Sequence, residues 1–396
     1  MALFAWSTRL MTGPAPNARS RLIEASATLA ITDTANKLRA AGHDVVSLGA
    51  GEPDFPTPEP IARAGIEAIK QGNYRYTSAA GTPALRQAGA EWLSSSFGLD
   101  YAADEVMVCA GAKAALYMAL TTILEPGDRV LILAPYWVSY PAMVTLAGGE
   151  PVILPANPER GFIHDEASIE AMAKQHGAAG VIINFPNNPS GSVPNKNDIR
   201  ALIDVCTRRD MWIISDEIYS TLLYDDAEHT SPASLPGGRE RTIVVNGFTK
   251  SHTLTGWRTS FLAASKEIVA TAARLQSQVL GNPSTISQAA TLKACQHPLP
   301  EEHQQRIEAF TERRDYLVEA VNKLPGISLA KPRGAFYALM DLRPICDERG
   351  ITDLQACQQL LDEHHLALVP GSAFGAPGFL RASLAAQLAT ATTPDE

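Results

Sequence analysis

The sequence has few features that mark a membrane protein, a nucleic-acid-binding protein or a disulfide-stabilised protein. Its five cysteines are odd in number and form no CxxC or Cys/His pattern, which argues against a disulfide framework and a zinc site. No apolar run has the length of a membrane span, and residues 1–6 lack the basic start and long apolar centre of a signal peptide. The net charge of −9 offers no basic surface for nucleic acid. We therefore expect a cytoplasmic protein that binds no metal, no membrane and no nucleic acid.

Short apolar runs alternate with helical segments through the middle of the chain, at the spacing of β-strands joined by helices. Seven such runs lie at residues 106–109, 130–133, 152–154, 181–184, 212–215, 243–246 and 261–264. Runs that are apolar on both faces are typical of parallel strands covered on two sides. We therefore predict an α/β fold with a mainly parallel seven-stranded sheet between helices.

The chain has 396 residues, which is long for one core and favours a large domain with a smaller one formed by both chain ends. Residues 21–41 have the apolar spacing of an amphipathic helix that ends at Gly42. From residue 285 the pattern changes to long helices and then to short strands at 335–340 and 366–369. We expect a flexible N-terminal extension (1–20), a large domain (57–284), and a small α+β domain built from 21–56 and 285–396.

A lysine and an arginine follow the sixth apolar run. Lys250 lies on the loop just after residues 242–245, at the carboxyl end of the predicted strand, where ligands bind in open α/β sheets. A lysine held there away from water has a lowered pKa and can attack a carbonyl to form a Schiff base. Arg258, eight residues later, is well placed to hold an anion. A lone pair of this kind is more often two solvated surface charges, so the rest of the chain must decide.

Two earlier loops carry groups that suit a phosphate and a flat ring. Residues 110–115 are small and open a helix, and a helix N-terminus presents unpaired N–H groups to a phosphate. Small residues at a helix start also serve packing, so this signal is weak alone. Residues 135–140 place an aromatic cluster at a strand end, where a core position for Trp137 is the ordinary interpretation.

Three further loops carry polar groups or glycines. Residues 184–191 are rich in turn formers and bring an asparagine amide to a strand end. Asp216 and Tyr219 are three residues apart, close enough to face one ligand. The Gly/Pro-rich residues 49–58 are either a substrate-gripping loop or a plain connection. An imine-forming lysine, an acid, a phenol, an amide, a flat aromatic and two phosphate-binding groups are the set that pyridoxal phosphate requires.

From about residue 26 to 385 the chain resembles the class I/II aminotransferases of pyridoxal-phosphate fold type I, most closely the bacterial aspartate and aspartate/prephenate branch. The resemblance is specific because many motifs occur in the same order. They are GEPDFPTP (51–58), YTSAAGTPALR (76–86), APYWVSYP (134–141), NFPNNPSG (184–191), SDEIY (215–219), FTKSHTLTGWR (248–258), GAFY (334–337), VPGSAFG (369–375) and RASLA (381–385).

The resemblance implies catalytic roles for three residues. Lys250 resembles the Schiff-base lysine, which then moves the proton between the substrate's Cα and the cofactor. Asp216 resembles the partner of the pyridine nitrogen. Tyr219 and Asn188 resemble the ligands of the ring oxygen, and Trp137 resembles the aromatic residue that stacks on the ring and lines the substrate site.

The remaining cofactor contacts implied by the resemblance surround the phosphate. They are Gly111, Ala112, Lys113, Thr249 and Arg258 from the same chain, and Tyr76 from the neighbouring subunit. Thr249 stands where the family commonly has serine and keeps its hydroxyl. Because Tyr76 would act across a subunit boundary, the resemblance implies a homodimer with two shared active sites.

The resemblance also implies the substrates. Arg381 matches the residue that takes the α-carboxylate as a bidentate pair, helped by Gly51 and Asn188. Lys113 and Thr28 match positions that hold the second carboxylate of a dicarboxylic substrate. We therefore expect ping-pong transamination between aspartate or glutamate and oxaloacetate or 2-oxoglutarate.

Two departures from the family pattern bear on substrate choice. Residues 279–281 (Val-Leu-Gly) replace a hydroxyl-rich segment, which makes the wall supplied by the second subunit more apolar. The chain ends about fifteen residues after Arg381, where the family continues into a closing helix, so we expect domain closure to differ. Two alternatives stay open at this point. One is a specialised pyridoxal-phosphate enzyme that acts on another amino acid or catalyses elimination or oxidation, and the other is a regulatory protein that only senses the cofactor.

Overall fold

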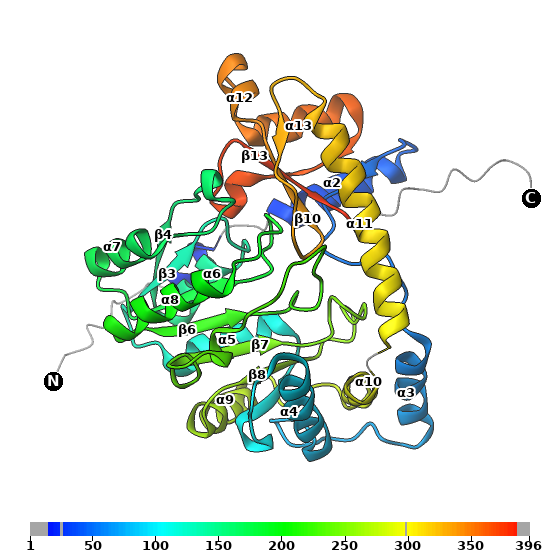
Figure 1. The fold of residues 1–396 in the computed structure, drawn as a ribbon. Coiled ribbons are helices and arrows are strands. Elements are labelled where there is room, and N and C mark those ends of the chain that lie inside the picture. Colours follow the sequence, from blue (N-terminus) through cyan, green and yellow to red (C-terminus); the bar gives the residue numbers. More distant parts are fainter. Residues whose placement is uncertain (1–14, 24–26, 298, 386–396) are drawn as a thin grey trace, which may run out of the picture.

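The computed structural model of the chain describes residues 15–23, 27–297 and 299–385. Its centre is a seven-stranded sheet with the order β2-β8-β7-β6-β5-β3-β4 (Figure 1). The strands are β2 (Val106–Cys109), β3 (Arg129–Leu133), β4 (Glu150–Leu154), β5 (Gly180–Asn184), β6 (Trp212–Asp216), β7 (Thr242–Asn246) and β8 (Ser260–Ala263). β3 to β7 pair in parallel, and β8 is antiparallel to both β7 and β2. The predicted fold class is confirmed, and each strand lies within two residues of its predicted run.

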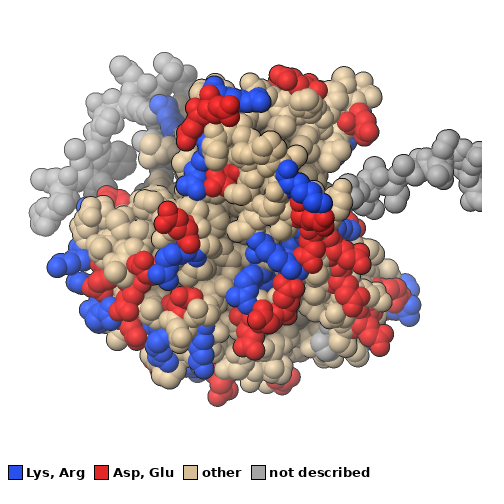
Figure 2. Space-filling view, turned by 45° about the horizontal axis from the view of Figure 1, so that its top comes forward, with Lys and Arg blue, Asp and Glu red and all other residues tan. Residues whose placement is uncertain are grey.

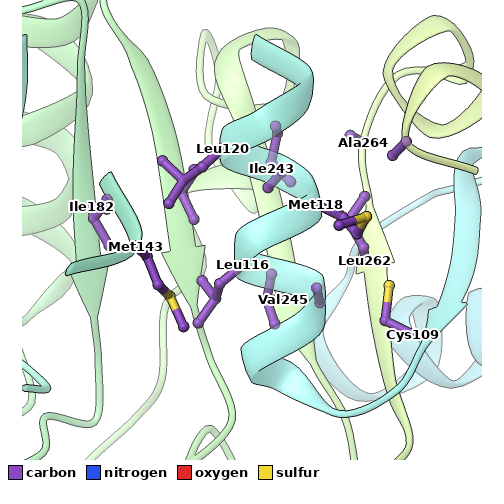
Figure 3. Packing of buried hydrophobic residues seen from close by; sticks show 14 of the residues in the cluster. Cys109, Leu116, Met118, Leu120, Met143, Ile182, Ile243, Val245, Leu262 and Ala264 are labelled. Carbon is purple, nitrogen blue, oxygen red and sulfur yellow. The ribbon is translucent and has the colours of Figure 1, made fainter. Parts of the chain in front are cut away.

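Helices cover both faces of this sheet because successive residues of its strands are apolar. In β5, Ile182 packs into the cluster formed with α5 (Ala112–Ile123), while Val181 and Ile183 pack on the opposite face. Figure 3 shows α5 crossing the strands, with Leu116 and its neighbours between the helix and the sheet. The other helices around the sheet are α3 (Glu59–Lys70), α4 (Pro83–Phe97), α6 (Tyr140–Ala147), α7 (Glu166–His176), α8 (Lys196–Arg208), α9 (Lys266–Val279) and α10 (Thr285–Gln296). Short 3-10 helices are η1 (Ala103–Glu105), η2 (Pro158–Arg160), η3 (Pro232–Ser234), η4 (Arg239–Arg241) and η5 (Gly371–Phe374).

Both ends of the described chain meet in a second group of elements. β12 (Val369–Pro370), β13 (Phe379–Ser383), β10 (Tyr337–Asp341) and β9 (Ser328–Leu329) form an antiparallel sheet in that order. β1 (Val46–Ser47) pairs in parallel with β11 (Leu366–Ala367), which joins the N-terminal segment to the C-terminal one. α2 (Ala27–Ala40), α12 (Arg343–Arg349) and α13 (Asp353–His364) surround these strands, and the long α11 (Pro300–Asn322) runs from α10 towards them (Figure 1). The exact domain boundaries stay a prediction.

The predicted helix over 21–41 is wrong at its start. A separate one-turn helix, α1 (Ala18–Arg21), comes first because the Asn17 side chain accepts a hydrogen bond from the backbone N–H of Ser20 (2.8 Å) and caps it. Leu22 lies in a turn and is exposed, so it does not belong to the buried face of α2. The predicted end is confirmed, since α2 stops at Ala40 and Gly42 takes a positive φ of 91°. Residues 1–14 of the predicted extension and the chain end after residue 385 lie outside the described residues.

The surface carries charges of both signs. Figure 2 shows basic and acidic side chains intermixed on the face that it presents, so this face has no single basic area. Among the helices of residues 15–23, 27–297 and 299–385, none combines the length and apolar character that crossing a membrane requires.

Candidate active site

Three neighbouring strands of the large sheet end at one edge, and each is followed by a predicted site residue. β5, β6 and β7 are adjacent and parallel, so their carboxyl ends face the same way. Asp216 is the last residue of β6, Lys250 lies four residues after β7, and Asn188 lies four residues after β5. The sheet therefore brings residues from distant parts of the sequence to the edge where ligands bind in such folds.

The Lys250 amine lies against the glycine-rich loop before α3. Its Nζ donates a hydrogen bond to the carbonyl oxygen of Gly51. Burial is the main cause that lowers the pKa of Lys250 to about 8; Glu52 opposes the shift, and the charges of Arg381 and Arg258 add to it. Near neutral pH a share of this amine is neutral, and the neutral amine is the form that attacks a carbonyl.

The Asp216 carboxylate is buried and held by two donors. The Tyr140 hydroxyl donates to its Oδ2 (2.7 Å), and the backbone N–H of Ile218 donates to its Oδ1 (3.3 Å). Burial raises the pKa of Asp216 to about 6, although these two hydrogen bonds oppose the shift. A carboxylate in such surroundings favours a positively charged partner, such as a protonated ring nitrogen.

Arg381, on β13, is a fully buried cation that forms no ion pair within the described part of the chain. It is 2% exposed, and its guanidinium lies between the rings of Tyr337 (4.6 Å) and Phe374 (4.8 Å). Nη1 donates to Asn188 Oδ1 (3.1 Å) and Nη2 to the Gly49 carbonyl (2.8 Å). Its Nε is buried and has no hydrogen-bond partner among the described residues. Because an uncompensated buried charge is costly, this geometry suits an anionic ligand such as a carboxylate.

The start of α5 and Arg258 together form an anion-binding corner. Gly111 precedes α5 with a φ of 88°, and a Cβ at this position would collide with the Arg258 guanidinium. The guanidinium itself is fixed by hydrogen bonds to the carbonyls of Thr255 (3.0 Å) and Ala110 (3.4 Å). Glycine at 111 thus lets a cation lie beside the unpaired N–H groups of a helix N-terminus, which is an arrangement that binds phosphate.

The predicted ring-binding residues lie beside the same edge. The hydroxyls of Tyr219 and Tyr337 are 3.1 Å apart. Trp137 packs edge-on against Tyr140, with the ring centres 5.5 Å apart, and lies 4.8 Å from Lys113 Nζ. Burial, aided by the charge of Arg258, lowers the pKa of Lys113.

Two predicted residues, Tyr76 and Val279, lie exposed at the surface of the single chain. Tyr76 is 98% exposed and lines a hollow of about 670 Å³ together with Tyr74 and Asn282. Val279, in the segment expected to wall the substrate, is 65% exposed. The Thr249 hydroxyl donates to the Thr259 carbonyl (3.2 Å). Ala112 is the first residue of α5, and Thr28 lies in α2, but its side chain is outside the described part of the structure.

Two residues of the site were missed by the sequence reasoning. Tyr140 bonds to Asp216 although 76 positions separate them, and its signal was present in the aromatic cluster 135–140, one helical turn after Trp137. Tyr337 contacts both Tyr219 and Arg381 and lies in the motif 334–337, whose sequence alone does not indicate this role.

These residues fit pyridoxal phosphate. Four features support this fit. They are the lowered pKa of Lys250, the buried carboxylate of Asp216, the space beside Arg258 that a Cβ at Gly111 would occupy, and the buried Arg381 guanidinium with its unpartnered Nε. Residues 43–394 also match the family described as aminotransferase class I and II. The chain belongs to this family. It is therefore a pyridoxal-phosphate-dependent aminotransferase, since members of the family use this cofactor.

Individual relatives agree with the family over nearly the whole chain. The aminotransferase is 42% identical to an aspartate aminotransferase of Geobacillus stearothermophilus and 40% identical to a probable aspartate/prephenate aminotransferase of Aquifex aeolicus, with 92% of each chain covered in both cases. Among solved structures, an aspartate aminotransferase from Thermus thermophilus with maleate superposes with a TM-score of 0.89 at 39% identity, covering 94% of this chain and 96% of that one. The aspartate aminotransferase of Rhizobium meliloti gives 0.91 at 37% identity, with 95% and 96% covered.

Proposed function

We propose that this aminotransferase moves an amino group between a dicarboxylic amino acid, aspartate or glutamate, and oxaloacetate or 2-oxoglutarate. The observation that carries the choice of a dicarboxylic substrate is a second cation, Lys113, whose Nζ lies 4.8 Å from the centre of the Trp137 ring. The α-carboxylate, which every amino acid has, is assigned to the buried Arg381 guanidinium with its unpartnered Nε. A carboxylate would satisfy it with two parallel hydrogen bonds. Lys113 supplies the second cation, for the other carboxylate. The relatives named above support the same substrates.

Lys250 and Asp216 divide the proton chemistry. Pyridoxal phosphate, when bound, supplies an electron sink that makes the hydrogen on the substrate's α-carbon acidic. The Lys250 amine would take that proton from the substrate's Cα and deliver it to the cofactor's C4′, and its pKa of about 8 suits this role near neutral pH. Asp216 keeps the ring nitrogen protonated, and the Tyr140 hydroxyl holds Asp216 in place.

The other residues bind and orient. Arg381, with Asn188 and Gly51, takes the α-carboxylate, and Thr28 assists Lys113 at the side-chain carboxylate. Trp137 would stack on the cofactor ring, and Tyr219 and Asn188 would contact its oxygen. Gly111, Ala112, Thr249 and Arg258 would hold the phosphate, and the N-terminus of α5 would add its partial positive charge.

A second copy of the chain completes each site in this proposal. Tyr76 reaches the neighbouring phosphate, and residues 279–281 line the neighbouring substrate pocket. The exposure of Tyr76 and Val279 in one chain supports this, because large aromatic and apolar side chains at a surface mark contact sites. The protein works in the cytoplasm as a homodimer whose large domain spans 57–284.

The test is a steady-state assay in which aspartate and 2-oxoglutarate are varied together and glutamate or oxaloacetate formation is followed. Ping-pong chemistry predicts parallel lines in double-reciprocal plots, because one product leaves before the second substrate binds. Turnover only with monocarboxylic amino acids would overturn the substrate proposal. Release of ammonia instead of a new amino acid would overturn transamination.

A further inference from the structure

Next to Asp216 lies a second acid that none of the roles above uses. Glu217 is 0% exposed, and three side chains donate to its carboxylate. Ser215 Oγ (2.8 Å) and Ser231 Oγ (2.6 Å) donate to Oε1, and His229 Nε2 is 3.1 Å from Oε2. The carboxylate is therefore fully buried and fully hydrogen-bonded.

These contacts fix the turn that directly follows Asp216, the last residue of β6, and contains Tyr219. The backbone N–H of Glu217 donates to the Val245 carbonyl (2.8 Å), which extends the β6–β7 pairing by one residue. The Glu217 carbonyl accepts a hydrogen bond from the Ser220 N–H (2.9 Å), which closes a turn from Glu217 to Ser220 that contains Tyr219. The side chain then joins this turn to the segment at 229–231.

A buried acid is an expensive way to hold a turn. Removing a carboxylate from water costs free energy, and well-packed apolar residues often replace a buried charge without loss of stability. A role beyond stability accounts for its presence at this position. The charge of Glu217 also acts on Asp216. Burial is the largest cause that raises the pKa of Asp216, the hydrogen bonds from Tyr140 and Ile218 oppose it, and the charge of Glu217 adds a smaller increase.

We propose that Glu217 is a positioning residue that holds the turn between Asp216 and Tyr219 in the orientation that binds the cofactor ring. Ser215, His229 and Ser231 act through it by fixing its carboxylate. Glu217 itself does not touch the reacting atoms. The inference depends on the cofactor, which the family establishes, and not on the choice of substrate proposed above.

The test compares Glu217→Gln with a matched control, Thr242→Val. Thr242 is buried in the neighbouring strand β7 but at its opposite end, where its hydroxyl donates to the Gly238 carbonyl (2.7 Å). Both changes are nearly isosteric and alter one buried polar network. Three properties would be measured: the thermal stability of the cofactor-free protein, the dissociation constant of pyridoxal phosphate, and the circular dichroism of the bound cofactor's visible band.

Glu217→Gln should weaken pyridoxal phosphate binding about tenfold, the scale of one lost hydrogen bond to a charged group, and should change the sign or strength of the visible dichroism. Thr242→Val should lower the thermal stability about as much as Glu217→Gln does. It should change the dissociation constant of pyridoxal phosphate and the visible dichroism by no more than about twofold. Cofactor binding and dichroism unchanged in Glu217→Gln would reduce Glu217 to a structural role and overturn the proposal.

A second variant covers the case in which Glu217→Gln does not fold. Ser231→Ala removes one donor to Glu217 from a residue that also caps the short helix η3. It should weaken cofactor binding about threefold and shift the visible dichroism in proportion, because one of three donors is lost. An unaltered dichroism and dissociation constant in this variant would equally contradict the proposal.

Discussion

Two regions of this chain carry predicted site residues, and they differ in how complete they are. At the carboxyl ends of β5, β6 and β7, Asp216 and Arg381 are buried and each is held by several hydrogen bonds. In the second region, the large side chains of Tyr76 and Val279 are exposed to solvent. A single chain therefore fixes the side chains proposed for acid–base chemistry and carboxylate binding by its own contacts. We proposed above that a second copy of the chain covers the exposed region of Tyr76 and Val279.

The largest effect is expected from removing the buried Lys250 amine. Lys250→Ala removes the only side chain proposed to attach the cofactor and move the proton, so turnover should fall at least about a thousandfold while the protein stays folded. Activity and the visible absorbance of the bound cofactor would be measured, with exposed Lys323→Ala as the control. A Lys250→Ala protein with the normal visible band and full activity would show that the nucleophile is another residue.

The second prediction tests which substrate carboxylate the buried Arg381 guanidinium binds. Arg381→Ala should lower kcat/KM about a hundredfold for every amino-acid substrate, mainly through KM, because hydrogen bonds to charged groups contribute roughly 1.5–3 kcal/mol. The variant would be assayed with aspartate, glutamate and a monocarboxylic amino acid. A loss confined to the two acidic substrates would move Arg381 to the side-chain pocket.

The pH dependence of the buried amine gives a third test. The pKa of Lys250 is lowered to about 8, so the rate at which pyridoxal phosphate loads onto the cofactor-free protein should rise about tenfold per pH unit below 8 and level off above it. The same shift predicts a stability change: the unfolded chain holds this proton up to a higher pH, so the cofactor-free fold gains stability as pH rises from about 8 towards 10.5.

In Lys250→Ala, this part of the stability profile should be lost. Chemical denaturation of both proteins between pH 7 and 10 would measure it. Identical profiles for the two proteins would mean that the amine stays fully charged in the folded state.

A smaller effect tests whether the exposed region is completed by a second copy. Tyr76→Phe should weaken pyridoxal phosphate binding about fivefold, because one hydrogen bond to the phosphate is lost, and should leave the subunit fold unchanged. The dissociation constant would be measured together with the oligomeric state by sedimentation. If the protein is a monomer and Tyr76→Phe leaves its affinity for pyridoxal phosphate unchanged, the proposal that Tyr76 completes the site of a second subunit is wrong.

The smallest effect concerns substrate choice at the same surface. Leu280→Ser returns a hydroxyl to the apolar segment and should lower KM for aspartate about twofold to threefold, the scale of one exposed hydrogen bond. KM values for aspartate and for an apolar amino acid would be compared with those of the unaltered protein. A higher KM for aspartate would mean that residues 279–281 do not face its carboxylate.

Local sequence patterns predicted those parts of the molecule that local chemistry determines. The apolar runs gave the strands of the large sheet within two residues, and the parallel arrangement then placed Asp216 and Lys250 at one edge. The separate helix α1 was missed because a single side-chain contact, the hydrogen bond from Ser20 N–H to Asn17, caps its start. The roles of the site residues stay predictions that the experiments above address.

Contacts between distant positions could not be predicted from local patterns. The hydroxyl of Tyr140 reaches Asp216 across 76 positions, and the ring of Tyr337 meets Tyr219 across 118. The partners of Glu217 at 229 and 231 likewise come together only through the turn after β6. The periodicity of apolar residues indicates which side of a strand is buried. It does not indicate which polar side chains from distant positions contact each other.

The most direct measurement is a half-reaction. The cofactor-loaded protein would be mixed with one amino acid at a time, without any oxo acid, while the visible band of the bound cofactor is followed. We predict rapid loss of the band with aspartate and with glutamate, and formation of one equivalent of the matching oxo acid per site. No response to either, together with a response to a different amino acid, would contradict this prediction and direct attention to the apolar segment 279–281.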